Sequence, residues 1–390
     1  MGFVKFDNVR IKGIAVVVPE KEISIYDEAQ YYDNNLKKIA RMHKIVGFNK
    51  RRVVEEGICA SDLATQAGEN LLNSLEINRN DIDALIYVNQ RPTYRGVVDA
   101  YEIHHRLSLS ENCICTNVNQ GCVGWVWGLY LCAQMLASGV NKNILLLNAD
   151  TSSVAIDIAD RNQAPIFGDA GSATLVTYDL TAKTSYFGIR TLSDGFDKII
   201  SPAGGTRIRY DIDLPSSDPF NAPLFDRIET KPGYSTKLMH GQLDGGAVFE
   251  FTVNEVPKHL KEILKFSKLT QSDIAKLCLH QANKQIVQTI AMAADFSLEN
   301  TPTDAFETYG NNTMCSIPTV LLDLAEKEGN FDSKPYLCSG FGNGLVIASS
   351  VLDFEQTVNA GIKTFTKGPD FKTRDEWIDY WKNKIANTNA

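Results

Sequence analysis

The stretch NQGCVGWVWGLYLCAQMLASG, residues 119–139, predicts a helix that is apolar on nearly every side and that stops at a glycine. A cysteine, Cys122, stands where this buried helix begins. A helix N-terminus offers unpaired N–H groups and the positive end of the helix dipole, and both favour a thiolate. We therefore expect the pKa of Cys122 to lie below the usual value of about 8.5, which makes this cysteine a candidate nucleophile near neutral pH.

Short apolar runs alternate with amphipathic stretches on both sides of this helix. The runs DALIYV (83–88) and NILLLNA (143–149) have the composition of strands that are buried on both faces. A further strand is predicted at GSATLVTYDL (171–180). Ser61 and Asp62 are candidate N-caps of an amphipathic helix that follows them.

The second half of the chain repeats this order of strands and helices. Helices are predicted over 253–269 and 284–294, and between them a strand over 274–283 runs into a loop. A loop and helix over 309–329 precede a strand pair over 334–354. Alternation in both halves predicts an α/β fold in which helices are layered on central sheets.

The length of 390 residues exceeds the usual size of one domain, so we expect two core-forming halves, residues 1–180 and 181–354. Residues 201–240 are rich in Pro, Gly, Asp and Ser, which is typical of an irregular, lid-like insertion. Residues 355–390 form an expected C-terminal extension, which ends in the aromatic, amphipathic segment DEWIDYWKNKI.

Composition narrows the class of protein. A formal net charge of -8 and a pI near 5.4 argue against nucleic-acid binding through the whole surface. No signal-peptide pattern and no apolar run of about 18 residues is present, so we expect a cytoplasmic chain that does not bind a membrane. None of the eight cysteines forms a C-x-x-C pair or stands at zinc spacing from a histidine, which predicts free thiols and no metal site.

Two polar residues of the second half follow predicted buried segments. His280 lies in LHQAN, directly after a predicted strand, and Asn283 is placed to hold the turn that follows. Asn311, in YGNN, follows a glycine and precedes a helix whose start we expect at Thr313 or Ser316. A neutral amide in such a place can stabilise an anion without giving up a proton.

The segment SGFGNG (339–344) is a glycine-rich turn between two predicted strands. Glycines let backbone N–H groups approach a reacting carbonyl closely. It is not a phosphate-binding loop, because no Lys-Ser or Lys-Thr pair and no strand-to-helix context follow it.

Five motifs occur in a fixed order: NVNQGCVGW, FGDAGSATLV, LHQAN, YGNNTMCSIP and SGFGNGLVIASSV. In this order they resemble the 3-oxoacyl-ACP synthase III family of thiolase-fold condensing enzymes. The resemblance covers roughly residues 10–354. It implies a dimer whose subunit stacks two related α/β halves in five layers, with the active cysteine at the head of a buried helix.

The resemblance also implies roles for individual residues. Cys122 matches the acyl-accepting nucleophile, and His280 and Asn311 match the other members of a Cys-His-Asn triad. Asn283 matches a supporting residue, and the oxyanion hole would be formed by the backbone N–H groups of Cys122 and Asn343. The implied reaction is decarboxylative condensation of an acyl group, held on the cysteine, with a malonyl thioester, for which no metal or redox cofactor is required.

The sequence departs from the family at the segment that grips coenzyme A. RMHKIVGFNKRR (41–52) has Arg41 where the family has a tryptophan and Ile45 where it has an arginine. An acyl-carrier protein is therefore a candidate carrier beside acyl-CoA, and lysines that recur at helical spacing could face such an acidic partner. These lysines are Lys258, Lys261, Lys265 and Lys268.

Other functions remain open at this stage. The acyl group on Cys122 could pass to a hydroxyl or amine without decarboxylation, or to water, as in a thioesterase. A non-catalytic partner subunit is a further alternative. The hydroxymethylglutaryl-CoA synthase type is disfavoured, because YVNQRPTYRG (87–96) lacks the general-base glutamate that this type needs.

Overall fold

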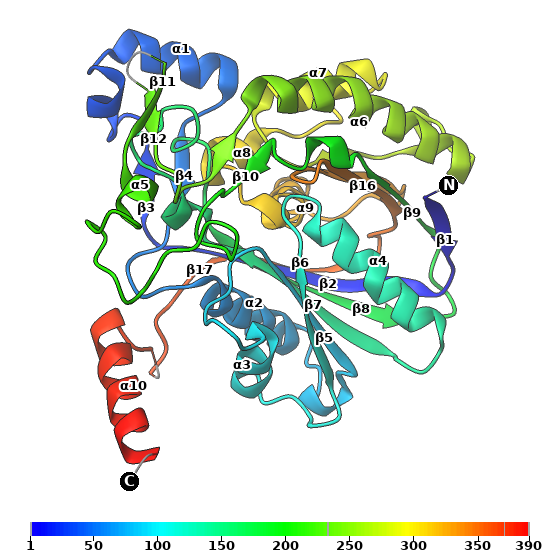
Figure 1. Ribbon diagram of the computed structural model, residues 1–390. Coiled ribbons are helices and arrows are strands. Elements are labelled where there is room, and N and C mark those ends of the chain that lie inside the picture. The colour runs from blue at the N-terminus through cyan, green and yellow to red at the C-terminus, as the bar shows by residue number, and fades with distance from the viewer. Residues whose placement is uncertain (1, 232–233, 370, 389–390) are drawn as a thin grey trace.

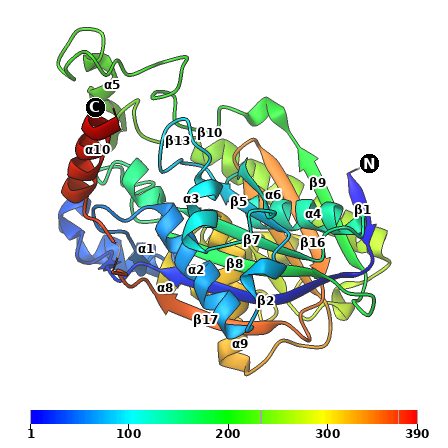
Figure 2. The same cartoon turned by 90° about the horizontal axis from the view of Figure 1, so that it is seen from below.

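The computed structural model describes residues 2–231, 234–369 and 371–388. Its architecture is five layers, in which two mixed β-sheets alternate with three layers of helices (Figures 1 and 2). The expected thiolase-like α/β fold is confirmed. No helix in the described ranges has both the length and the apolar character needed to cross a membrane.

The first sheet has six strands in the order β17-β2-β8-β7-β5-β6. Their bounds are Val358–Thr364, Val9–Val18, Ala170–Tyr178, Asn143–Asp150, Ala84–Asn89 and Ile114–Asn119. β5 pairs in parallel with both β6 and β7, whereas β8 is antiparallel to its neighbours β7 and β2. The predicted strands over 83–88, 143–149 and 171–180 thus lie side by side at the centre of this sheet.

The second sheet has five strands in the order β1-β9-β16-β15-β14. Their bounds are Phe3–Phe6, Ser185–Thr191, Val346–Leu352, Tyr336–Gly342 and Leu277–Leu279. The antiparallel hairpin of β15 and β16 confirms the predicted strand pair. The short pairs β3 (Glu22–Ser24) with β4 (Lys50–Arg52), β10 (Ile199–Ile200) with β13 (Gln242–Leu243), and β11 (Ile228–Lys231) with β12 (Tyr234–Thr236) lie outside both sheets.

Helices fill the space between and outside the sheets. The central layer holds α4 (Gly124–Ala137) and α9 (Ser316–Glu328), which pack on both sheets. The first sheet is covered on its outer face by α2 (Ala60–Ser74) and α3 (Asp99–Arg106), and the second sheet by α6 (Gly245–Ser267) and α7 (Lys284–Ala293). Remaining helices are α1 (Leu36–Val46), α5 (Ala222–Phe225), α8 (Asp304–Tyr309) and α10 (Arg374–Thr388).

Three large apolar clusters lie between the layers. The largest cluster surrounds α4 and joins it to both sheets, with the fully buried Trp125 among its members. A second cluster lies between the first sheet and α2 with α3, and a third between the second sheet and α6 with α7. This position accounts for the apolar side chains of α4 that face the two sheets, as in Trp125 and Leu129. The opposite side of the helix keeps contact with water, because Trp127, Tyr130 and Leu131 are only half-buried and Gln134 is exposed.

Each end of the chain adds an edge strand to one of the two sheets. β1, near the N-terminus, pairs with β9 in the second sheet, and β17, from the expected C-terminal extension, pairs with β2 in the first. The division at residue 180 stays a prediction. Residues 201–240 hold only short elements, and a role as a lid stays a prediction too.

Two predicted helix starts are wrong. α2 is capped by Cys59 rather than by Ser61 or Asp62, because Asp62 bonds back to the N–H of Cys59 in a capping box. α6 begins at Gly245, eight residues before the predicted start, where Oδ1 of Asp244 accepts a hydrogen bond from the N–H of Ala247. In both cases a side chain outside the apolar pattern decides where the helix begins.

Candidate active site

Cys122 lies in the tight turn between the end of β6 and the start of α4. The N–H of Gly124 donates to the carbonyl oxygen of Gly121 at 2.7 Å and closes this turn. Behind it, Nε1 of Trp125 donates to Oγ1 of Thr174 at 3.0 Å and ties α4 to the first sheet. The thiol is thus held at the head of a rigid, buried helix, as the sequence predicts.

Two glycines of β15 allow that strand to pass directly against Cys122. A Cβ on Gly340 would lie 2.7 Å from the carbonyl oxygen of Cys122, and a Cβ on Gly342 would lie 3.0 Å from its Sγ. Real Cβ atoms almost never approach so closely. The motif SGFGNG therefore supplies space beside the thiol as well as backbone N–H groups.

The prediction that the pKa of Cys122 is lowered is wrong. Burial raises the pKa of this thiol to about 12, and the negative charge of Asp150 adds to the rise. The hydrogen bond from its own backbone N–H at the helix start lowers the pKa by less than burial raises it. Loss of water around a thiolate costs more than the partial charge of a helix end returns. The resting residue is therefore a thiol that must lose its proton during attack.

His280 directly follows β14, and its N–H donates to the carbonyl oxygen of Ser339 on β15 at 2.9 Å. Its imidazole packs edge-on against the ring of Phe341, with centroids 5.4 Å apart. Burial lowers the pKa of His280 to about 4, and a hydrogen bond with the backbone of Thr313 opposes this shift only in part. The ring is neutral at pH 7 and offers one N–H donor and one acceptor.

Asn311 is placed by backbone bonds on both sides. Its N–H donates to the carbonyl oxygen of Ile166 at 2.8 Å, and its carbonyl oxygen accepts from the N–H of Gly168 at 3.1 Å. The side-chain Oδ1 accepts from the N–H of Thr313 at 2.9 Å. This bond fixes the amide so that its NH₂ group, a donor, points the opposite way.

A short 3-10 turn, η6 (Thr313–Cys315), connects these residues. Its Thr313 backbone contacts both His280 and Asn311, and its Met314 side chain lies 2.9 Å from the place of a Cβ on Gly124, at the head of α4. Together with β15, which touches Cys122 and His280, this turn brings the three predicted site residues to one place. The expected helix start at Thr313 or Ser316 is confirmed, since η6 begins at Thr313 and α9 at Ser316; the N-cap of α9 is Cys315, and no side chain caps it.

The two other predicted site residues have clear positions. Oδ1 of Asn283 accepts from the N–H of Ile286 at 2.8 Å and caps α7, which holds the turn after His280. Asn343 directly follows β15, and its Oδ1 fills the space that a Cβ on Gly121 would take. The turn that carries the predicted oxyanion N–H thus packs against the loop that carries Cys122.

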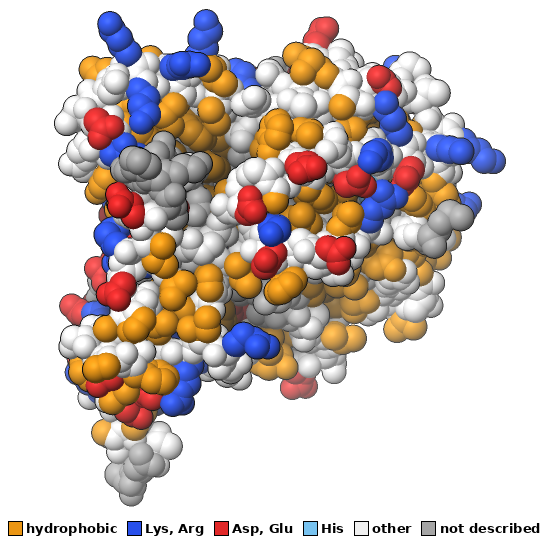
Figure 3. All heavy atoms as spheres, turned by 45° about the horizontal axis from the view of Figure 1, so that its top comes forward, with side chains coloured by type: hydrophobic (Ala, Val, Ile, Leu, Met, Phe, Trp, Pro, Cys, Tyr) orange, Lys and Arg blue, Asp and Glu red, His pale blue; other side chains and the backbone are white. Residues whose placement is uncertain are grey.

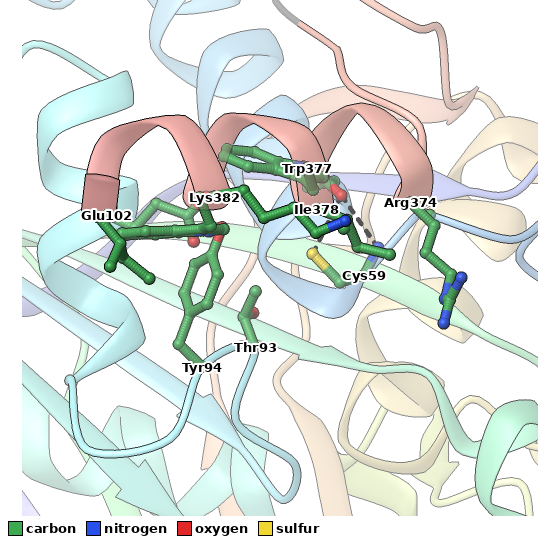
Figure 4. Close-up of a pocket in the computed structure, with 12 residues that line it drawn as sticks. Cys59, Thr93, Tyr94, Glu102, Arg374, Trp377, Ile378 and Lys382 are labelled. Carbon is green, nitrogen blue, oxygen red and sulfur yellow. Dashed lines mark hydrogen bonds between the residues drawn. The ribbon is translucent and has the colours of Figure 1, made fainter. Parts of the chain in front are cut away.

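A cavity of about 520 Å³ lies elsewhere, beneath α10 (Figure 4). Tyr94 points up from the body of the protein and makes edge-on ring contacts with Trp377 and Trp381 at 6.3 and 6.0 Å between centroids. No residue of α10 is buried. The C-terminal helix therefore packs back on the body through these aromatic contacts and through an ion pair of Arg374 with Glu56 at 3.7 Å.

One group of potential metal ligands was not predicted from the sequence. His104, Cys113 and Cys115 each place a ligand atom within 4.8 Å of the others. The available signal was a Cys-x-Cys pair nine residues after a histidine, which is not a common zinc spacing.

Two family models match the chain. Residues 116–195 match the model described as 3-oxoacyl-[acyl-carrier-protein (ACP)] synthase III, and residues 264–354 match the model of its C-terminal part. Cys122 falls in the first range, and His280 and Asn311 fall in the second.

Similar proteins cover nearly the whole chain. A 3-oxoacyl-[acyl-carrier-protein] synthase 3 from Campylobacter jejuni is 35% identical over 364 residues, which is 93% of this chain and 99% of the relative. A beta-ketoacyl-[acyl-carrier-protein] synthase III from Fusobacterium nucleatum is 28% identical over 88% of this chain and 98% of its own. The crystal structure of a 3-oxoacyl-(acyl-carrier protein) synthase from Burkholderia xenovorans superposes with a TM-score of 0.83 at 28% identity, over 93% of this chain and 98% of that one.

Proposed function

Because the chain belongs to the 3-oxoacyl-[acyl-carrier-protein] synthase III family, we propose that Cys122, His280 and Asn311 are its catalytic residues. The enzyme is an acyltransferase of the condensing type. It joins an acyl group held on cysteine to a malonyl thioester and forms a 3-oxoacyl thioester. The observation that supports the residue assignment is a chain of contacts: β15 passes against both Cys122 and His280, and the backbone of Thr313 contacts both His280 and Asn311.

In the first half-reaction, Sγ of Cys122 attacks the carbonyl carbon of an acyl thioester. The thiol proton leaves the sulfur as the new bond forms, passes through the neutral ring of His280 and ends on the departing carrier thiol. The N–H groups of Cys122 and Asn343 hold the tetrahedral oxyanion, and each such donor contributes about 3 kcal/mol to the transition state. The acyl group then stays on the enzyme while the first carrier leaves.

In the second half-reaction, a malonyl thioester takes the place of the first carrier. The neutral imidazole of His280 and the NH₂ group of Asn311 donate to its thioester carbonyl oxygen. The bond between the malonyl α-carbon and its carboxylate carbon breaks, and carbon dioxide departs. The electron pair of the broken bond stays on the α-carbon and forms an enolate, which these two donors hold. The enolate carbon attacks the acyl carbon on Cys122, and the sulfur leaves as a thiolate when the product forms. The thiolate then takes up one proton from solvent, which restores the resting thiol.

Intact-protein mass spectrometry tests this assignment. The reduced enzyme is incubated with a panel of acyl-CoAs and acyl-carrier proteins, and then with malonyl-carrier protein. We expect an adduct on Cys122 that disappears only with the malonyl donor, as a 3-oxoacyl thioester appears. C122A should form no adduct, whereas C59S, which alters another partly exposed thiol, should behave like the wild type.

Two further outcomes separate the assignment from its alternatives. N311A should still form the acyl-enzyme but lose condensation, because Asn311 acts on the malonyl thioester. An adduct that ignores the malonyl donor would instead indicate transfer to another acceptor. Absence of any adduct would indicate a non-catalytic subunit.

The acyl carrier that we propose is an acidic acyl-carrier protein, which docks on α1. Lys37, Arg41 and Lys44 are exposed, share one face of this helix and form no ion pair among the described residues. The segment 36–46 contains no acidic residue. Basic side chains stand on the upper left of the face in Figure 3, over the region that Figure 1 assigns to α1.

The lysines of α6 are less suited to this role. Lys258 pairs with Glu255 at 2.7 Å, and Lys261 pairs with Asp295 at 2.8 Å. In Figure 3, acidic and basic side chains are intermixed on the right of the face, over the region of α6. A mixed surface attracts an acidic partner less than a uniformly basic one does.

Charge reversal distinguishes the two helices. K37E/R41E/K44E should raise the KM for acyl-carrier protein at least tenfold, with kcat little changed, and the effect should shrink in high salt. The matched control is K258E/K261E/K265E on α6. A larger effect of the control would move the docking site to α6.

We also assign a homodimer, in which β6 meets its copy. β6 ends the six-stranded sheet and pairs only with β5 among the described strands, and its residue Ile114 is 55% exposed. An open, partly apolar edge strand is an association surface. Sedimentation should give a dimer for the wild type and a monomer for I114K, and a monomeric wild type would contradict the assignment.

A further inference from the structure

A second cluster of chemically reactive side chains lies where α3 meets β6. His104 is in the last turn of α3, Cys113 immediately precedes β6, and Cys115 is the second residue of β6. One ring nitrogen and the two sulfur atoms all lie within 4.8 Å of one another. This cluster is separate from Cys122, which follows the opposite end of the same strand.

The cluster is ordered by the turn that connects its two elements. The carbonyl oxygen of Ser110 lies 2.9 Å from Nε2 of His104 and accepts the N–H of Cys113 at 2.9 Å. The N–H of Leu109 also donates back to the carbonyl oxygen of His104 at 3.2 Å. Such a contact from a ring nitrogen to a backbone oxygen is the usual second interaction of a metal-bound histidine, because it orients the ring.

The surroundings combine an apolar floor with access from solvent. Cys113 belongs to the core cluster beneath α3, and Cys115 packs against that cluster. His104 and Cys115 keep partial solvent contact. Cys113 and Cys115 project to the same side of the strand, since alternate residues of a strand share a face.

Two thiolates and one imidazole form a donor set that favours zinc. The ligand atoms of a tetrahedral zinc site lie about 3.4–3.8 Å apart, as bonds of about 2.3 Å to sulfur and about 2.0 Å to nitrogen require. The three atoms lie within 4.8 Å of one another, so binding requires the separations between them to shrink by about 1 Å. Soft sulfur ligands select zinc over magnesium or calcium.

We infer that His104, Cys113 and Cys115 bind one zinc ion, with water at the fourth position, and that this ion joins α3 to the start of β6. Two Zn–S bonds form as two thiol protons are released to solvent, and the lone pair of a neutral ring nitrogen forms the third bond. The ion neither changes oxidation state nor takes part in the condensation. This site stands independently of the proposed function.

Cobalt titration tests the site, because Co²⁺ replaces zinc and its thiolate complexes absorb in the near ultraviolet. The background is C122A, so that the thiol beside His280 cannot bind the metal. We expect one Co²⁺ per chain, displacement of Co²⁺ by Zn²⁺, and a higher thermal unfolding midpoint with metal than without it.

Substitutions locate the ligands. In this background, C113A, C115A and H104Q should each weaken Co²⁺ binding by more than about 100-fold. Loss of a residue that only hydrogen-bonds to a ligand can already weaken binding by about 100-fold, so loss of a direct ligand should cost more. C59S is the matched control and should bind Co²⁺ like the background protein. Thermal unfolding of the metal-free variants, which should resemble that of the metal-free background, separates ligand loss from unfolding.

Two results would overturn the inference. The first is a cobalt complex that survives both C113A and C115A. The second is a reduced, folded C122A protein that forms no thiolate–cobalt complex, whether or not the two cysteines are found as a disulfide on isolation.

Discussion

The side-chain oxygen of Asn343 occupies the space that a Cβ on Gly121 would need, so the turn after β15 and the loop before Cys122 fit together through these two residues. Nε2 of Gln90 lies 2.9 Å from the same point. The glycine at position 121 and the asparagine at position 343 are therefore complementary. The side chain of Asn343 takes no part in the proposed chemistry, yet its fit against Gly121 sets the distance between the two segments that carry the proposed oxyanion N–H groups.

This relationship predicts energetic coupling between the two positions. G121A should slow formation of the acyl-enzyme about tenfold, a loss of about 1.4 kcal/mol in the transition state. N343G should remain close to the wild type, because it keeps the backbone N–H. The double variant G121A/N343G should recover part of the loss in single-turnover mass spectrometry. A double variant as slow as G121A alone would show that the two residues are not coupled.

The approach of β15 to the nucleophile predicts a larger effect at Gly342. A Cβ there would lie 2.9 Å from Cβ and 3.0 Å from Sγ of Cys122. G342A should reduce the rate of acylation at least about 100-fold, the cost that a misplacement of 1 Å can have. The thermal unfolding midpoint should change little. G205A is the matched control, because nothing lies within 4 Å of a Cβ at that glycine.

The raised pKa of Cys122 predicts a distinctive pH dependence of alkylation. With a pKa of about 12, the thiolate fraction should rise tenfold for each pH unit between 7 and 9. The iodoacetamide rate at Cys122, followed by peptide mass spectrometry, should rise in proportion. A rate that levels off near pH 7 would contradict this prediction. It would show that the helix dipole lowers the pKa of Cys122 by more than burial raises it.

Two buried histidines predict loss of stability in acid. Burial lowers the pKa values of His280 and His259 to about 4 each, from 6.5. Between these values the unfolded chain binds protons that the folded chain does not, so the free energy of unfolding falls as the pH drops from 6.5 towards 4. At pH 5 each histidine accounts for about 2 kcal/mol of that loss.

His259 allows this prediction to be checked outside the proposed site, since its Nδ1 bonds only to Oγ of Ser349, at 2.9 Å, among the hydrogen bonds found in the described ranges. H259Q should reduce the difference in unfolding free energy between pH 7 and pH 5 by about 2 kcal/mol, as measured by urea denaturation. An unchanged difference would mean that His259 titrates normally in the folded chain.

Much of the fold was predictable because its signals are local. The strands over 83–88, 143–149 and 171–180 are apolar along their whole length, and they lie at the centre of the first sheet. The sheet that each terminal strand joins was not predictable. β1 joins the second sheet and β17 joins the first, and each is a short strand whose partner lies far away in sequence. Pairing of this kind depends on which sheet edge is open, and an open edge exists only once the layers have formed.

The sequence by itself determined the order of strands and helices, the place of Cys122 at the head of a buried helix, and the motifs that pointed to His280 and Asn311. Only the tertiary structure decided the direction of the pKa shift of Cys122 and the meeting of His104 with Cys113 and Cys115. The physical reason is the range of the interactions. Helix and strand preferences act over a few residues, whereas dehydration of a thiol and the convergence of ligand atoms depend on every element packed around them.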